Sequence, residues 1–207
     1  MAKAGLERAL DRHRTAISAC RACGDRVAGA TPVVSLARRP RVMLVGQAPG
    51  QVERESQRPF SGRAGRTLFR WLAEAGLDER DARDRIYIAA ITRCYPGPAR
   101  SGRGDRVPSP AEQANCSGWL DAELDIIRPE LIIPVGRLAI DRFLGRQPLE
   151  RLIGREHVAE VSGRQARIIP LPHPSGASSW IHGPGHGELL RGALAALRLR
   201  LGETLYL

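Results

Sequence analysis

The sequence predicts an α/β protein in which a parallel sheet is covered by helices on both faces. Two observations predict this class. Short, continuously apolar runs, such as 41–46 and 131–136, are typical of strands that are buried on both faces. These runs alternate with longer segments of helical periodicity, and that order favours parallel strands joined by crossover helices. The sequence shows no second apolar core, so we expect a single domain over residues 1–207.

The first half of the chain predicts two helices and two strands. Residues 4–19 are amphipathic, and the apolar run 41–46 leads into the glycine-containing loop GQAPG. We expect a helix over 62–76, because apolar side chains recur on one face and Gly76 suits its C-terminal end. The apolar run RIYIAAI (85–91) is the second expected strand.

The second half opens with a loop rich in proline, glycine and arginine (95–108). A helix is expected to follow it as far as Arg128, because Ser109, Pro110 and Glu112 form a capping box with proline at the first helical position. The remaining elements are expected strands at 131–136 and 167–172 and expected helices at 137–144 and 187–201. Functional loops of such sheets gather at the carboxyl ends of the strands, and we expect the site there.

The basic composition favours a polyanionic partner. The net charge is +10, and every basic residue except Lys3 is arginine, whose planar fork suits phosphate groups. A compositional bias toward arginine on ordinary solvated faces would explain the same charge. No run approaches the roughly 20 apolar residues of a membrane span, and residues 1–20 are typical of an amphipathic helix and not of a signal peptide. We therefore expect a cytoplasmic protein that does not associate with membranes.

The four cysteines predict a metal site. They are Cys20, Cys23, Cys94 and Cys116, in the spacing C-x2-C-x70-C-x21-C. Four cysteines in a protein expected in the cytosol point to metal binding more than to disulfides. One close pair with two isolated cysteines is compatible with a 4Fe–4S cluster, although spacing alone does not separate iron–sulfur from zinc. A redox-active CxxC pair or a set of unrelated buried thiols would also be compatible with this spacing.

Four motifs occur in a fixed order along the chain: GQAPG at 46–50, PFSGRAG at 59–65, AAITRC at 89–94 and HPSG at 173–176. With the cysteines interleaved among them, the chain resembles the uracil-DNA glycosylase superfamily, and most closely its iron–sulfur branches, families 4 and 5. The resemblance covers roughly residues 17–200. Any one of these motifs would be a weak signal, and their order makes the resemblance specific.

The resemblance implies a three-layer αβα fold around a four-stranded parallel sheet. It implies a DNA repair enzyme that works as a monomer and hydrolyses the N-glycosidic bond of uracil in DNA, after flipping the base into a pocket. It also implies that the four cysteines hold a structural 4Fe–4S cluster.

The resemblance further implies roles for individual residues. Phe60 would stack on the flipped base, although a phenylalanine before a helix is otherwise a core residue. His173 would donate a hydrogen bond to a base carbonyl as negative charge develops there, the alternative being a solvated loop histidine. The other expected base-binding residues are Gly46, Ala48, Gly50 and Ala90. The expected DNA-binding residues are Ser175, Gly176, Gly62, Arg63 and Arg103.

The positions where the superfamily carries its catalytic carboxylates are vacant in this chain. They hold Gln47, Ala48 and Arg63, none of which is an acid. Gln47 is therefore expected to orient the attacking water together with backbone carbonyls. Alternatively a nearby acid, Glu53 or Glu55, takes this role, and otherwise these two are solvated loop carboxylates.

At two positions near the base, this sequence also departs from the residues that families of the superfamily carry. Ala90 replaces an asparagine that reads uracil in family 4, and Gly50 replaces a bulky tyrosine of family 1. We therefore hypothesise a roomier pocket that also accepts deaminated bases such as hypoxanthine or xanthine.

A non-catalytic protein that binds uracil or damaged DNA is the alternative function. Covalent attachment to DNA is disfavoured, because the relative with that behaviour carries a histidine that loop 95–108 lacks.

Two segments are expected to meet DNA outside the pocket. Loop 95–108 carries Arg100, Arg103 and Arg106 and would track the DNA backbone, unless it is only a surface excursion. Trp180 or Ile181 would be the apolar wedge that fills the gap left by the flipped base.

Overall fold

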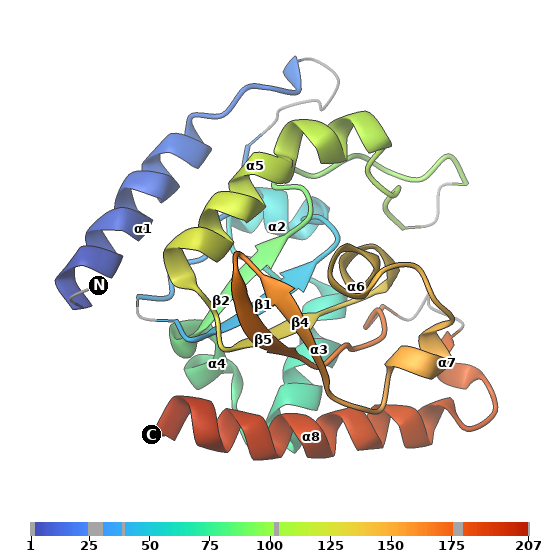
Figure 1. The fold of residues 1–207 in the computed structure, drawn as a ribbon. Coiled ribbons are helices and arrows are strands. Elements are labelled where there is room, and N and C mark those ends of the chain that lie inside the picture. The colour runs from blue at the N-terminus through green and yellow to red at the C-terminus, as the bar shows by residue number, and fades with distance from the viewer. Residues whose placement is uncertain (1–2, 25–30, 39, 102–103, 176–179, 207) are drawn as a thin grey trace.

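The structure is a computed structural model that describes residues 3–24, 31–38, 40–101, 104–175 and 180–206. A twisted five-stranded sheet lies at its centre (Figure 1), with the strand order β2-β1-β3-β5-β4. The strands are β1 (Val42–Gly46), β2 (Ile86–Ala90), β3 (Leu131–Pro134), β4 (His157–Val161) and β5 (Arg164–Ile168). The pairs β1–β2, β1–β3 and β3–β5 are parallel, and β4 pairs with β5 in the antiparallel direction.

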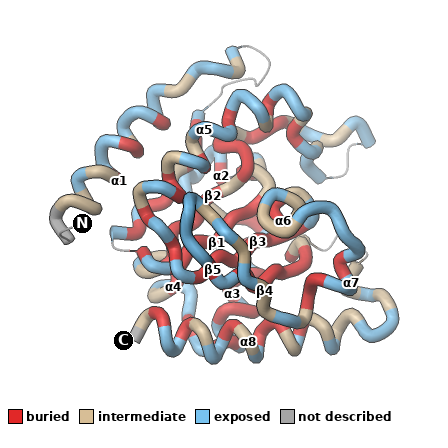
Figure 2. The backbone as a smooth tube through the Cα atoms, viewed as in Figure 1, coloured by how far each residue is buried: buried red, intermediate tan, exposed pale blue. Residues whose placement is uncertain are grey.

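Helices cover both faces of this sheet, which confirms the predicted three-layer αβα arrangement. The helices are α1 (Lys3–Ser18), α2 (Gln51–Ser56), α3 (Arg63–Glu74), α4 (Glu79–Arg85), α5 (Pro110–Ile127), α6 (Arg137–Leu144), α7 (Leu149–Leu152), the short 3-10 helix η2 (Trp180–His182) and α8 (His186–Tyr206). One apolar core joins the sheet to α3, α7 and α8, and the other joins it to α1, α5 and α6. The buried residues gather along the strands and the inner helix faces (Figure 2).

The predicted number of strands needs one correction. The segment His157–Val161 is a fifth strand that closes one edge of the sheet, and its residues are alternately half-buried and exposed. A two-residue turn with positive φ at Ser162 (51°) and Gly163 (71°) joins it to β5, as in a type I′ hairpin. An edge strand with this mixed pattern lacks the continuous apolar run that predicts a strand buried on both faces, so the sequence does not indicate it.

The start of α5 is the best predicted helix boundary. The Ser109 hydroxyl accepts a hydrogen bond from the Glu112 N–H at 3.3 Å, and the Glu112 carboxylate accepts one from the Ser109 N–H at 2.7 Å. The capping box is therefore confirmed. The three short helices α2, α4 and α7 were not predicted, since none is long enough to show an apolar periodicity.

A buried charged group joins α1, β2 and α5. The Glu123 carboxylate on α5 accepts a hydrogen bond from the Tyr87 hydroxyl at 2.8 Å and lies 3.3 Å from His13 Nε2 on α1. Arg93, just beyond β2, forms a salt bridge with the same carboxylate. All four side chains are buried, so this network fixes the layer that α1 and α5 form. None of the helices in the described ranges is both long and apolar enough to cross a membrane.

Candidate active site

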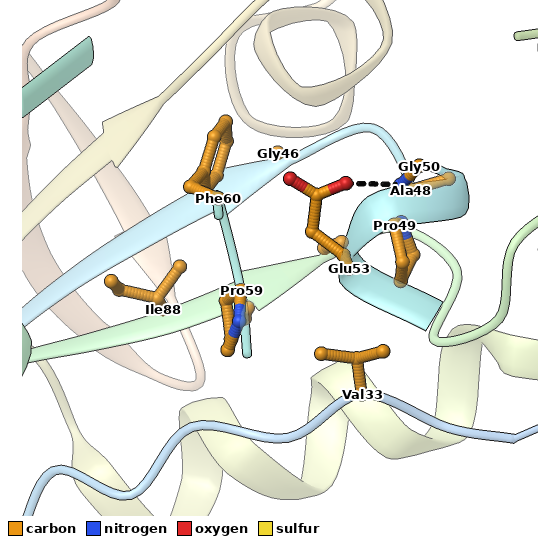
Figure 3. Close-up of a pocket in the computed structure, with 11 residues that line it drawn as sticks. Val33, Gly46, Ala48, Pro49, Gly50, Glu53, Pro59, Phe60 and Ile88 are labelled. Carbon is orange, nitrogen blue, oxygen red and sulfur yellow. Dashed lines mark hydrogen bonds between the residues drawn. The ribbon is translucent and has the colours of Figure 1, made fainter. Parts of the chain in front are cut away.

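A cavity opens where strands β1 and β2 end. Its wall comes from the loop after β1, the end of β2 and the turn before α3, with Val33 on the far side (Figure 3). The five expected base-binding residues line this cavity: Gly46, Ala48, Gly50, Phe60 and Ala90, whereas the two expected catalytic residues, Gln47 and His173, are not among the residues of its wall. The structure therefore brings these residues together at the carboxyl edge of the sheet, where ligands of such folds bind.

The Phe60 ring is fixed by its backbone and its neighbours. Phe60 has a positive φ of 51°, an uncommon conformation for a bulky residue. Arg83 of α4 donates hydrogen bonds to the carbonyl oxygens of Pro59 at 2.7 Å and Phe60 at 3.1 Å, which holds this turn. A Cβ atom on Gly65 would lie 1.8 Å from the Phe60 oxygen, and one on Gly46 would lie 2.9 Å from the ring atom Cζ. Glycine at these two positions lets the ring lie against the cavity wall.

Glu53 joins the two loops that form the cavity. It is only 9% exposed, and its Oε2 accepts a hydrogen bond from the Gly50 N–H at 3.0 Å (Figure 3). Its Oε1 accepts a hydrogen bond from the Gly62 N–H at 2.7 Å. The alternative of a solvated loop carboxylate is therefore wrong for Glu53. Glu55, in contrast, is exposed on α2 and accepts a hydrogen bond from Gln51.

His173 is partly buried beyond the end of β5, beside Gly136. The Ser175 N–H donates a hydrogen bond to His173 Nδ1 at 3.2 Å, and the Ser175 hydroxyl lies 2.9 Å from the same nitrogen. Because a backbone N–H can only donate, Nδ1 is the acceptor and a neutral ring carries its proton on Nε2. Burial lowers the pKa of His173, and the negative charge of Asp105 partly opposes this effect. The neutral ring with an Nε2–H donor is therefore the form present near pH 7.

Asp105 is a carboxylate at the cavity that the sequence did not identify. It lies on loop 95–108, where Pro98 and Asp105 form an isolated antiparallel bridge. A Cβ atom on Gly50 would lie 2.9 Å from Asp105 Oδ2 and 2.7 Å from Glu53 Oε2. The space beside Gly50 is thus occupied by two carboxylates. One feature of the sequence could have pointed to Asp105 as a site residue: it is the only acidic residue in the arginine-rich loop 95–108.

The pKa of Asp105 is raised by its surroundings. Partial burial raises it most, and the charge of Glu53 acts in the same direction. A hydrogen bond from Tyr95 and the charge of His173 lower it. The Asp105 carboxylate is therefore in electrostatic range of both Glu53 and His173.

The remaining predicted residues lie around this cavity or outside the described structure. Gln47 is half-buried, and its carbonyl oxygen accepts a hydrogen bond from the Thr92 N–H at 3.2 Å. Gly62 is the N-cap of α3, and Arg63 is exposed in the first turn of that helix. Gly176 and Arg103, expected to bind DNA, lie outside the described residues.

Trp180 is held by contacts within the protein. Its indole Nε1–H donates to Glu150 at 2.8 Å, and its ring stacks on His186 with ring centroids 4.2 Å apart. His186 Nδ1 also lies 2.5 Å from the Trp180 carbonyl oxygen. These contacts join η2 to α7 and α8, and they restrain the side chain that the sequence suggested as a DNA wedge.

The four cysteines line a second cavity, between the end of α1, the loop after β2, and α5. Burial, together with the charges that Cys116, Cys23 and Cys20 would carry, raises the pKa of Cys94 to about 12. The Arg93 N–H donates a hydrogen bond to the Cys116 sulfur at 3.3 Å. In the described part of the chain, no three histidine, cysteine or acidic side chains form a group able to hold a single metal ion.

The chain matches the family model of the Uracil DNA glycosylase superfamily over residues 34–197. The chain belongs to this superfamily. The chain is 33% identical over 136 residues to a Type-4 uracil-DNA glycosylase of Thermotoga maritima, and this matched region covers 65% of each of the two chains. A Type-4 enzyme of Sulfurisphaera tokodaii is 36% identical over 48% of this chain and 41% of the relative.

A second group of relatives carries a different name. A Type-5 uracil-DNA glycosylase of Mycobacterium bovis is 34% identical over 142 residues, which is 62% of this chain and 50% of that relative. The chain thus spans between about two fifths and two thirds of the length of these curated relatives. Both branches that the motifs indicated are therefore found among its relatives.

Proposed function

We propose that this protein is a DNA repair glycosylase that hydrolyses the N-glycosidic bond of uracil in DNA. The observation that carries the proposal is the cavity at the end of β1 and β2, which all five expected base-binding residues line. Membership of the superfamily and the names of the relatives support the same activity. The net charge of +10 suits a DNA partner.

Two side chains act on the flipped base in this proposal. The base stacks on Phe60, whose ring is fixed against Gly46. The Nε2–H of His173 donates a hydrogen bond to a base carbonyl oxygen as the glycosidic electron pair moves onto the base. A preorganised donor of this kind contributes about 3 kcal/mol in a dry site. Ser175 supports the reaction by holding the ring in the required tautomer.

The other expected residues bind DNA or water. Ser175 and Gly176 would hold one phosphate, and Gly62, Arg63 and Arg103 would hold the backbone near the flipped nucleotide. Gln47 would orient water from the end of β1. We also propose that the enzyme acts as a monomer in the cytoplasm, where the four free thiols would remain reduced.

The breadth of base recognition is inferred from the small residues Gly50 and Ala90. Both line the cavity, and neither has a side chain that can form a hydrogen bond to a base edge. We therefore propose that hypoxanthine and xanthine are released as well as uracil. Rates of release of uracil, hypoxanthine, xanthine and thymine from matched oligonucleotides test this, and strict uracil preference would contradict it.

The four cysteines fit a 4Fe–4S cluster in the chemistry of their donor set. All four thiols surround one cavity, and the Arg93 N–H already donates to the Cys116 sulfur, as donors around cluster sulfurs do. A four-iron cluster is wider than one ion, so thiols spread around a cavity fit it better than they fit zinc. When bound, the cluster would link α1 to α5 and to the loop after β2.

Absorption and metal analysis of the purified protein test this part of the proposal. We expect a brown protein that absorbs at about 400 nm and contains iron and sulfide. Replacement of Cys94 by serine should remove the colour and destabilise the link between α1 and α5. Stoichiometric zinc without iron would contradict the cluster.

Incubation of the protein with uracil-containing DNA, followed by alkaline cleavage at the abasic site, tests the activity. We expect strand cleavage that depends on the protein, and a loss of at least about 100-fold in His173→Ala. The second candidate is a protein that binds damaged DNA without hydrolysis, which the non-acidic residues Gln47, Ala48 and Arg63 favour. Tight binding of uracil-containing DNA without release of the base would support this candidate and contradict the enzyme.

A further inference from the structure

We propose that Asp105 is the catalytic carboxylate of this site and accepts a proton from the water that attacks C1′ of the deoxyribose. This inference rests on the proposed glycosylase function. It assigns the role of general base to a loop residue, at none of the positions where the superfamily resemblance places an acid.

Asp105 lies at the rim of the base cavity. Its Oδ2 is next to Gly50, which lines the cavity, and the residue is exposed, so water reaches it. The base would be held inside the cavity by Phe60, and the sugar would remain outside, in the DNA strand. The glycosidic bond would therefore cross the rim where Asp105 lies.

The position of Asp105 is fixed by its local structure. The Ala99 N–H donates to the Gly104 oxygen at 3.0 Å, and the Arg106 N–H donates to the Gly97 oxygen at 3.0 Å. These two bonds flank the bridge between Pro98 and Asp105 and form a short ladder. The buried Tyr95 forms a hydrogen bond with the Asp105 carboxylate. A carboxylate held by a backbone ladder and a tyrosine hydroxyl is preoriented for one task.

The other acids near the cavity are not available to accept the proton of the attacking water. Both oxygens of Glu53 accept hydrogen bonds from backbone N–H groups of the cavity loops, so Glu53 has a structural role. Glu55 is exposed on α2 and forms a hydrogen bond with Gln51 there. One carboxylate oxygen of Asp105 can accept the hydrogen bond from Tyr95 while the other accepts a proton.

The charge of Asp105 complements the role of His173. The charge of each group affects the pKa of the other, so the two lie within electrostatic range of one another. His173 would stabilise negative charge on the departing base, whereas Asp105 would stabilise positive charge on the sugar. Partial burial raises the pKa of Asp105, which makes its carboxylate a stronger base than an ordinary aspartate.

The reaction balances with water as the only co-reactant. The C1′–N bond breaks and its electron pair leaves with the base, whose carbonyl oxygen receives the His173 hydrogen bond. A water oxygen forms the new bond to C1′, and one of its protons passes to Asp105. That proton then leaves to solvent while the base anion takes up a proton. The products are the free base and an abasic deoxyribose.

Single-turnover release of uracil from DNA by the full-length protein tests the role of Asp105. We expect Asp105→Asn to slow release by about 100-fold or more, the usual contribution of a general base. Asp105→Glu should recover part of the rate. Asp125→Asn is the matched control, because Asp125 is exposed on α5 and the substitution makes the same change in charge. Binding to DNA that contains an abasic-site analogue should stay equal or become tighter in Asp105→Asn.

The dependence of the rate on pH provides a second readout. Wild-type release should rise with pH as the Asp105 carboxylate forms, and Asp105→Asn should lack this rise. The ionisable groups that face Asp105 are Tyr95, Glu53 and His173. If Asp105→Asn keeps the wild-type pH rise, the assignment is overturned.

The outcomes separate this inference from the proposed function. If the wild-type protein releases no uracil, the glycosylase function itself is wrong. If wild type releases uracil and folded Asp105→Asn works within about threefold of it, only the role of Asp105 is wrong. If Asp105→Asn loses DNA affinity to the same extent as rate, Asp105 binds DNA and is not the base.

Discussion

Two buried glutamates, Glu53 and Glu123, hold different parts of this protein in different ways. Among the described residues, Glu53 accepts hydrogen bonds from two backbone N–H groups, of residues that lie 3 and 9 positions away in the chain. Glu123 binds side chains that lie between 30 and 110 positions away. The first carboxylate shapes a pocket, and the second joins elements of the fold.

This difference separates a residue that orders the candidate site from a residue that stabilises the fold. Glu53 orders two loops at the edge of the sheet, so its loss should affect the pocket more than the whole fold. Glu123 compensates the buried charge of Arg93 between α1, β2 and α5, so its loss should affect the whole fold. Four substitutions test this comparison.

The largest effect is expected from Glu123→Ala. It leaves the Arg93 guanidinium buried without its partner, and breaking such a pair costs about 3–5 kcal/mol. Urea denaturation followed by circular dichroism measures the loss. Glu130→Ala is the control, because Glu130 pairs with Arg41 at the surface and should cost less than about 1 kcal/mol. Equal losses in both variants would contradict the role of Glu123.

Glu53→Gln should affect the pocket more than the fold. The amide keeps one acceptor but turns an N–H donor toward a backbone N–H, which costs about 1–3 kcal/mol. Because the cavity loops then shift, we expect uracil release to fall by about 100-fold. Glu55→Gln, on the exposed side of α2, is the matched control. Unchanged kcat/KM in Glu53→Gln would show that the loops hold without it.

Tyr87→Phe removes one of the donors to Glu123 and leaves the Arg93 salt bridge in place. We expect a loss of about 1–2 kcal/mol in the free energy of unfolding, with uracil release unchanged. The chemical denaturation midpoint measures it. A loss as large as that of Glu123→Ala would mean that the hydroxyl, and not the salt bridge, dominates this network.

The smallest effect is expected from Arg106→Gln and depends on pH. Glu112 accepts hydrogen bonds both from a side chain, as Glu123 does, and from a backbone N–H group, as Glu53 does. Its donors are the Arg106 side chain and the Ser109 N–H. Arg106 is the main cause that lowers the pKa of Glu112 to about 2. A lowered carboxyl pKa stabilises the fold above the ordinary value of about 4.5, and this contribution is lost as the pH falls toward 2.

Wild type should therefore exceed Arg106→Gln in stability by about 1 kcal/mol at pH 6, and the gap should close between pH 4.5 and pH 2. Urea midpoints of both proteins across this range measure it. A gap that stays constant with pH would contradict the assignment.

The sequence predicted the strands that carry the site, because β1, β2 and β3 are continuous apolar runs. It missed β4, whose residues alternate between half-buried and exposed, and the short helices α2, α4 and α7. The cavity could be predicted because most of its residues belong to the motifs GQAPG, PFSGRAG and AAITRC. Asp105 could not, since no strand or motif precedes it and only the ladder within loop 95–108 brings it to the rim.

Glu53 shows a similar limit. The sequence identified Glu53 as one of two acids near the site, but the burial of Glu53 depends on the loop that contains Gly62, whose N–H donates to it. Contacts between separate loops are set by tertiary packing, which a local pattern does not encode.

The glycines of the cavity wall also restrict how the cavity could evolve. A side chain at Gly46 would displace the Phe60 ring, one at Gly50 would meet two carboxylates, and one at Gly65 would overlap the Phe60 backbone. A change in the shape of the cavity therefore has little freedom at these positions. Ala48 and Ala90, which also line the cavity, are the positions where single mutations can change the cavity without rebuilding its wall.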